Sequence, residues 1–104
     1  MRQIEPKELA AYLEANRPLL LDVREPWEFN ICHIDGSRLV PMGEIHLRLQ
    51  HLDPETETVV ICHHGIRSRQ VGMYLEYQGF GNVINLLGGV EAWAREVDPD
   101  MATY

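Results

Sequence analysis

The sequence predicts an α/β fold with a small parallel sheet of about five strands and helices on both faces. Two runs, 19–23 and 58–62, are apolar almost throughout instead of alternating, which is typical of strands covered on both faces. Between the apolar runs the period lengthens toward 3.6 residues, which indicates helices. Strands that alternate with helices favour parallel pairing through right-handed crossovers.

Three weaker strands complete the predicted sheet, at 3–4, 38–40 and 82–86. In such a sheet, ligands bind beyond the carboxyl ends of the strands. Two polar segments, 22–25 and 62–68, follow the two strongest strands. We therefore expect the chemistry at this edge of the sheet, with the second segment as its centre.

Two short helices are predicted in the N-terminal half. The first begins at Pro6, because the fixed φ of proline suits the first position of a helix, and it ends near Asn16. The second covers 43–50. The apolar period places these side chains inward: Leu9, Tyr12, Leu13, Ile45, Leu49 and Leu52.

Two more helices are predicted in the C-terminal half. The longer covers 67–78, and Gly79 follows it where a left-handed cap favours glycine. A last short helix begins at 88–89. The expected buried side chains of this pair are Val71, Tyr74, Leu75, Val90 and Trp93. We expect one domain over 1–104, with 98–104 as a loose tail.

The composition excludes several classes of protein. Its 45% hydrophobic and 24% charged residues are ordinary for a globular domain. The net charge is -7 and Lys7 is the only lysine, which argues against nucleic acid as a partner. No apolar run approaches the roughly 20 residues that cross a bilayer. The first residues lack a secretory signal, so we expect a cytoplasmic protein without membrane attachment.

The strongest candidate site is the loop that begins at Cys62. Four residues separate Cys62 from Arg67, which opens a helix, and Gly65 allows so short a loop to curl. Such a loop directs several N–H groups toward one point and forms an anion-binding nest. The thiol should therefore lose its proton readily and act as a nucleophile. Arg67, and His63 or His64 when protonated, would act in the same direction.

Four segments carry further motifs. They are LLDVREPWEF at 20–29, HIDGS at 33–37 with VP at 40–41, VVICHHGIRS at 59–68, and LGGVEAW at 87–93, preceded by GF at 79–80 and NV at 82–83. In this order they resemble the signatures of the single-domain rhodaneses, which are thiosulfate sulfurtransferases. The resemblance covers nearly the whole chain.

The resemblance implies a rhodanese-like fold and a catalytic Cys62 that accepts sulfur from thiosulfate or a similar anionic donor, releases sulfite and holds a persulfide. The acceptor would be cyanide or a thiol, and candidate acceptor proteins are thioredoxin-like or sulfur-relay proteins. No cofactor and no metal are implied. The substrate would be bound by His63, His64, Gly65, Ile66, Arg67 and Ser68. The resemblance implies that Arg67 either holds the loop or faces the anion. Asp22, Arg24 and Glu28 stand at positions of the first family signature. They would stiffen the edge of the site, with Arg24 paired to a carboxylate, and a simple surface ion pair is the open alternative.

Two alternative functions stay open at this stage. One is a relay module that receives persulfide sulfur from a partner protein. The other is a phosphatase or arsenate reductase on the same fold. It is less favoured, because phosphatases of the cell-cycle type have five residues between cysteine and arginine, and the shorter loop suits a single sulfur atom. His63 directly follows the cysteine, where rhodaneses with strong thiosulfate activity often carry a basic residue. Because imidazole is only partly charged near pH 7, weaker or pH-dependent use of thiosulfate is predicted.

Other polar residues have simpler explanations. Cys32 could resolve a persulfide by forming a disulfide, but a buried structural role is favoured. His33 is expected to be structural, and Cys62 with its two neighbouring histidines lacks the spacing of metal ligands. Trp27 is expected to pack at the end of its element, with a place in the wall of the site as the alternative. Arg69 is either a solvated helix residue or an aid in attracting anions.

Overall fold

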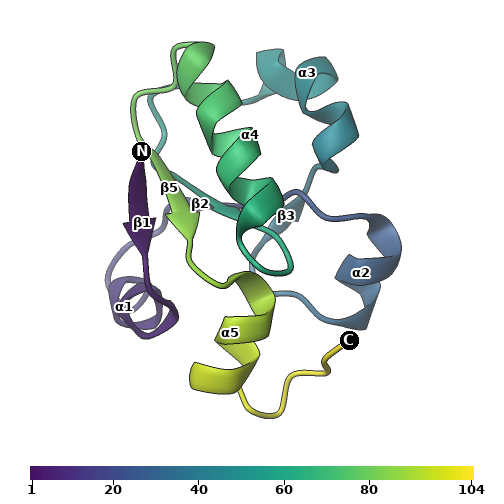
Figure 1. The fold of residues 1–104 in the computed structure, drawn as a ribbon. Helices are drawn as coiled ribbons and strands as arrows, with labels where there is room; N and C mark the ends of the chain where they lie inside the picture. The colour runs from purple at the N-terminus through teal and green to yellow at the C-terminus, as the bar shows by residue number, and fades with distance from the viewer.

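The computed structural model describes all 104 residues. Its centre is a five-stranded sheet in the order β1-β5-β4-β2-β3, in which every neighbouring pair is parallel (Figure 1). The strands are β1 (Arg2–Ile4), β2 (Leu19–Asp22), β3 (Arg38–Leu39), β4 (Thr58–Ile61) and β5 (Val83–Leu86). The predicted parallel α/β sheet is confirmed.

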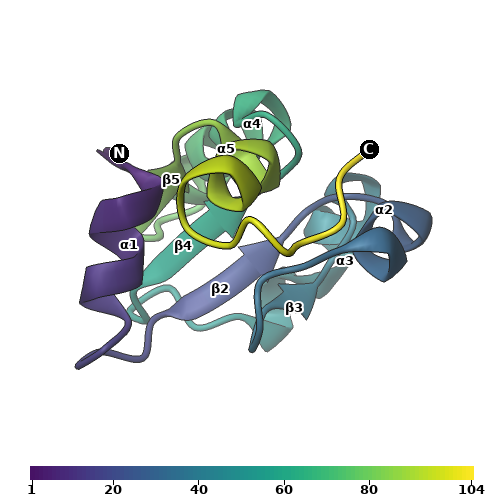
Figure 2. The ribbon, with the colours of Figure 1, turned by 90° about the horizontal axis from the view of Figure 1, so that it is seen from below.

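Helices cover both faces of the sheet (Figure 2). They are α1 (Pro6–Tyr12), α2 (Pro26–Ile31), α3 (Ile45–Arg48), α4 (Ile66–Tyr77) and α5 (Gly89–Glu96). One apolar cluster joins the sheet to α1 and α5, and the other joins it to α3 and α4. Successive strand residues divide between the clusters, as Leu20 and Leu21 do, because side chains alternate along a strand. No helix combines the length and the apolar character of a membrane-spanning segment.

Helix α2 was not predicted, although its start carries recognisable signals. Pro26 occupies its first turn, and Glu25 and Glu28 form a capping box in which each side chain accepts the other residue's backbone N–H. The helix is only six residues long, which is too short for an apolar period to stand out.

A second difference concerns Tyr74, which was expected to be inward and is 36% exposed.

Residues 98–104 contain no helix or strand, but the expectation of a loose tail is wrong. Met101 packs against the apolar cluster that contains Trp93. Tyr104 makes two side-chain hydrogen bonds and stacks on His63. After α5 the segment runs back toward α2 (Figure 2). The segment is therefore held by its side chains rather than by backbone pairing.

Candidate active site

The carboxyl ends of β2 and β4 lie side by side, because the strands are parallel neighbours with Asp22 opposite Ile61. The polar segments that follow them, 22–25 and 62–68, therefore meet at one edge of the sheet. This is the edge at which the strand order predicts a ligand site.

The side chain of Cys62 points into the molecule, and the residue is only 1% exposed. Its Sγ accepts a hydrogen bond from the N–H of Gly65 at 3.0 Å and lies 3.3 Å from the Oγ of Ser68. An N–H donor at this distance stabilises negative charge on sulfur. Helix α4 begins at Ile66, so its positive N-terminal end adds to the same effect.

The loop turns at Gly65, which has a φ of +97°. A Cβ at this position would lie 3.2 Å from the N of Gly88 and 3.3 Å from the O of Leu86. Both the left-handed conformation and the close approach favour glycine. The short path from Cys62 to Arg67 depends on this residue.

The N-terminus of α5 holds the first part of the loop. The N–H of Val90 donates to the carbonyl of Cys62 at 2.9 Å, and the N–H of Glu91 donates to that of His63 at 3.1 Å. Gly89 has a φ of +60°, and a Cβ there would collide with the same two carbonyl oxygens. Gly89 of the closing motif thus lets α5 approach the loop.

A chain of uncharged polar groups lies beneath the sulfur. The Oγ of Ser68 is 2.5 Å from the Oδ1 of Asn85, whose Nδ2 donates to the Oε1 of Gln3 at 2.9 Å. Ser68 is fully buried, and Asn85 is nearly so. A serine hydroxyl can accept from a thiol or rotate to donate to a thiolate. Asn85 was missed by the sequence analysis, although a polar residue inside an apolar strand is a readable signal.

Arg67 is held by Glu28 and does not point freely toward a substrate. Two hydrogen bonds of 2.8 Å join its guanidinium to the carboxylate. Glu28 also accepts from the backbone N–H of Glu25 at 2.9 Å. These contacts, the Arg67 guanidinium foremost, lower the pKa of Glu28 to about 2. Of the two expected roles for Arg67, the geometry favours that of fastening the loop.

Arg24 and Asp22 form a second ion pair, and both side chains are fully buried. The guanidinium lies 2.7 Å from Asp22 Oδ2 and donates to the carbonyl of Cys32 at 2.7 Å. Burial opposes the charge of Arg24, but the hydrogen bonds with Asp22 and Tyr104 outweigh it and raise the pKa of Arg24. The expected pairing of Arg24 with a carboxylate is present.

Tyr104 connects the two ion pairs, and no signal in the sequence pointed to it. Its hydroxyl accepts from Arg24 at 2.8 Å and donates to Glu28 at 2.9 Å. Its ring stacks on the imidazole of His63, with the centroids 3.9 Å apart and the planes at 13°. Trp27 meets the same ring edge-on at 5.8 Å. Burial raises the pKa of Tyr104 to about 12, so its O–H keeps the proton that it donates.

His63 is less readily protonated than an ordinary histidine. Its burial, and next the charge of His64, lower the pKa of His63 below the ordinary histidine value. The expectation that a protonated His63 would help the sulfur to ionise is therefore not supported at neutral pH.

The remaining candidates face outward. The side chains of His64 and Ile66 are exposed, and His64 Nδ1 lies 3.9 Å from Glu91. Arg69 is exposed as well. A cavity of about 340 Å³ on this outer side of the loop is lined by residues that include His64, Gly65 and Arg69. Among the six predicted binding residues, only Gly65 and Ser68 contact the Cys62 sulfur by hydrogen bonding.

Cys32 and Cys62 are both free thiols. They belong to different apolar clusters, and Cys32 lies 3.9 Å from the Nη1 of Arg24. The chain has no cluster of three or more His, Cys, Asp or Glu side chains suited to a metal ion.

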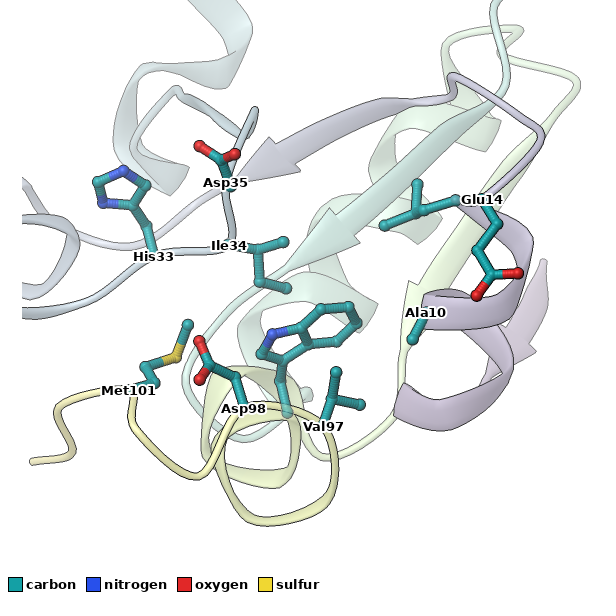
Figure 3. Close-up of a pocket in the computed structure, with 10 residues that line it drawn as sticks. Ala10, Glu14, His33, Ile34, Asp35, Val97, Asp98 and Met101 are labelled. Carbon is teal, nitrogen blue, oxygen red and sulfur yellow. The ribbon is translucent and has the colours of Figure 1, made fainter.

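A mainly apolar groove of about 470 Å³ lies on the α1 and α5 side of the molecule (Figure 3). Its lining includes Trp93, Ile34 and Met101, with the carboxylates of Asp35 and Asp98 beside them. No residue of the loop 62–68 lines it. The groove is therefore separate from the sulfur.

Comparison with known proteins identifies the family. The model of the rhodanese-like domain matches residues 5–96. The probable adenylyltransferase/sulfurtransferase MoeZ of Mycobacterium tuberculosis is 38% identical over 97% of this chain, but the chain spans only 26% of that protein. The thiosulfate sulfurtransferase GlpE of Ectopseudomonas mendocina is 36% identical over 88% of this chain and 84% of its own length.

The crystal structure of a rhodanese-related protein from Thermoplasma volcanium has the same fold. It is 31% identical, with a TM-score of 0.85 over 93% of this chain and 94% of its own. The resemblance seen in the four sequence motifs is thereby confirmed. The chain belongs to the rhodanese-like family.

Proposed function

We propose that this chain is a sulfurtransferase that carries a sulfane sulfur as a persulfide on Cys62. The observation that supports it most is the 3.0 Å hydrogen bond from the N–H of Gly65 to the Cys62 sulfur, inside a loop with four residues between Cys62 and Arg67. The donor is thiosulfate or a similar compound, and the acceptor is cyanide or a thiol. The two free cysteines suit the reducing conditions of the cytoplasm.

The reaction has two displacement steps. The Cys62 thiolate attacks the outer sulfur of thiosulfate, the bond between the two thiosulfate sulfurs breaks, and its electron pair leaves with sulfite. The acceptor thiolate or cyanide then attacks the outer sulfur of the persulfide, and the electron pair of that S–S bond returns to Cys62. The protein is unchanged after each cycle.

The residues around Cys62 have distinct roles in this scheme. The N–H of Gly65 stabilises the anionic sulfur before and after transfer. The Ser68 hydroxyl adjusts to either charge state by rotation. Arg67 and Glu28 hold the loop closed around the sulfur, while Asp22 and Arg24 hold the adjacent strand end.

A relay module is the second candidate, and the state of the cations favours it. Arg24 and Arg67 are each paired with a carboxylate, and His63 is largely uncharged at neutral pH. A site with so little free positive charge is poorly equipped to attract a dianion. In this scheme the sulfur comes from a partner protein, and thiosulfate is only a substitute.

Intact-protein mass spectrometry tests the proposal. Incubation with thiosulfate or with a persulfidated cysteine desulfurase should add the mass of one sulfur atom, and cyanide should remove it. Cys62→Ser should abolish the gain, whereas the matched variant Cys32→Ser should keep it. Loading by the desulfurase alone would select the relay. A gain that survives in Cys62→Ser, or hydrolysis of an aryl phosphate without any sulfur loading, would contradict the proposal.

A further inference from the structure

Tyr104 covers the loop from a segment that lies far from it in sequence. Its ring stacks on His63 and makes an edge contact with Trp27, and its hydroxyl bridges Arg24 and Glu28. Because the ring shields the imidazole, protonation of His63 must occur in a partly desolvated place. The tyrosine therefore acts on the group that directly follows the nucleophile.

The charges around His63 come from five elements. They are His64 in the loop, Arg67 in α4, Glu28 in α2, Arg24 after β2, and Glu91 in α5. Each arginine is paired with a carboxylate, and Glu91 faces Arg95 and His64. Arg69 is the exposed cation nearest in sequence, and it lines the cavity on the outer side of the loop. The side of the loop that Tyr104 covers therefore has no unpaired positive charge unless His63 is protonated.

The two candidate kinds of sulfur donor differ in the negative charge that they carry, and therefore in the positive charge that the site must supply to bind them. Thiosulfate brings two negative charges to the sulfur, so a nearby cation favours its binding. A persulfide carried on a thiol brings one negative charge or none. A covered, uncharged His63 discriminates between them, because it weakens binding of the dianion more than that of the persulfide.

We propose that Tyr104 is a positioning residue that sets donor specificity: by covering His63 with its ring, it makes a thiol persulfide the preferred sulfur donor over thiosulfate. This inference rests on the proposed function of Cys62. In the favoured step, the Cys62 thiolate attacks the outer sulfur of the donor persulfide. The donor S–S bond breaks, its electron pair leaves with the donor as a thiolate, and the persulfide forms on Cys62. The same step applies to a small persulfide and to a protein persulfide.

The experiment compares initial rates of sulfur loading on Cys62 by mass spectrometry for three donors: thiosulfate, glutathione persulfide and a persulfidated cysteine desulfurase. The variants are Tyr104→Ala, which uncovers His63, and Tyr104→Phe, which keeps the ring and loses the hydroxyl. Tyr77→Ala is the matched control, because Tyr77 is 89% exposed. The NMR titration of the His63 ring is followed in each protein, and this readout needs no activity.

Wild type should load from glutathione persulfide about tenfold faster than from thiosulfate at neutral pH. In Tyr104→Ala the titration midpoint of His63 should rise, and the ratio of thiosulfate to persulfide rates should increase roughly three- to tenfold near pH 6. Tyr104→Phe should resemble wild type in both measurements, as should Tyr77→Ala. Comparison of the loading rates from glutathione persulfide and from the desulfurase then distinguishes a small-molecule source of persulfide from a protein source.

Three results would overturn the inference while leaving the proposed function intact. They are faster loading of wild type from thiosulfate, an unchanged donor ratio in Tyr104→Ala, and an unchanged His63 titration. If Tyr104→Ala does not fold, His63→Lys serves instead, because it places a permanent cation under the intact ring. An unchanged donor ratio in that variant would also overturn the inference. Absence of loading from every donor in wild type would reject the proposed function itself.

Discussion

Two arginine–carboxylate pairs stand beside the Cys62 loop, and they differ in almost every physical respect. Arg24 and Asp22 are neighbours in sequence and wholly buried. Arg67 and Glu28 lie 39 residues apart, and although Glu28 is buried, the arginine side chain is 33% exposed. The wholly buried pair cannot be separated without leaving a charge out of water, whereas solvent reaches Arg67 and can partly compensate if its pair with Glu28 is broken. The first is expected to govern stability and the second the shape of the loop.

The largest effect should follow Arg24→Met. The substitution leaves Asp22 buried without its partner, and breaking a buried pair in this way costs about 3–5 kcal/mol. Urea unfolding measures the loss. Arg48→Met is the matched control, because Arg48 and Glu44 are both half exposed, and it should cost less than about 1 kcal/mol. Equal losses in the two variants would remove the distinction between buried and exposed pairs.

Arg67→Met should have a smaller effect on stability and a larger one on chemistry. Glu28 keeps its contacts with Glu25 and Tyr104, so the free energy of unfolding should fall by about 1–2 kcal/mol. Loosening of the loop should slow sulfur loading on Cys62 roughly tenfold. Arg67→Lys should not restore the rate, because lysine cannot make the two parallel hydrogen bonds.

For comparison, Arg69→Met should change the free energy of unfolding little, since Arg69 is an exposed residue of the same helix. If Arg67→Met proved as destabilising as Arg24→Met, with normal sulfur loading in the folded fraction, the two pairs would share one structural role.

The pair of Arg67 and Glu28 should also affect the dependence of stability on pH. The pKa of Glu28 is about 2 in the folded protein, against 4.5 for an ordinary glutamate. A carboxylate whose pKa is lowered by folding stabilises the protein fully above the ordinary value and loses that contribution as the pH falls toward the lower one. The difference in urea midpoint between wild type and Glu28→Gln should therefore shrink from pH 4.5 to about pH 2. A constant difference would contradict this assignment.

The smallest effect is expected from Ser68→Ala, which tests the contact between the Ser68 hydroxyl and the Cys62 sulfur. Loss of the hydroxyl leaves Asn85 Oδ1 without its donor and should cost about 1 kcal/mol. Sulfur loading should slow a few-fold. Ser37→Ala is the matched control, because Ser37 donates at 2.6 Å to the carbonyl of Ile34, outside the loop, and it should leave the loading rate unchanged. Equal rates in the two variants would exclude a role for Ser68 at the sulfur.

Much of the fold was predictable because its signals lie in consecutive residues. The apolar runs identified the strands, and the change of period located four of the five helices. Helix α2 was missed, although Pro26 and the capping box of Glu25 and Glu28 were readable. Tyr74 was placed wrongly because the apolar period of a helix does not distinguish a buried ring from one at the edge of the buried face.

The active loop was predictable in the same way, since Cys62, Gly65 and Arg67 follow one another within six residues. Gly65 illustrates this, because a short loop between a strand and a helix needs a residue that tolerates a positive φ, whatever its neighbours are. What Arg67 binds was not predictable. The guanidinium could have faced either an anion or a carboxylate, and only the position of α2 made it Glu28.

The sequence by itself determined the parallel sheet, the short loop after Cys62 and the membership in a sulfur-transfer family, because these depend on local spacing and on the period of apolar residues. The tertiary structure decided which charges are free at the site. Glu28, Asn85 and Tyr104 reach the loop from 34, 23 and 42 residues away from Cys62, and contacts over such separations leave no periodic mark on the chain. Folding alone brings them together. It places the Cys62 sulfur beside a backbone N–H and pairs the nearby arginines with carboxylates.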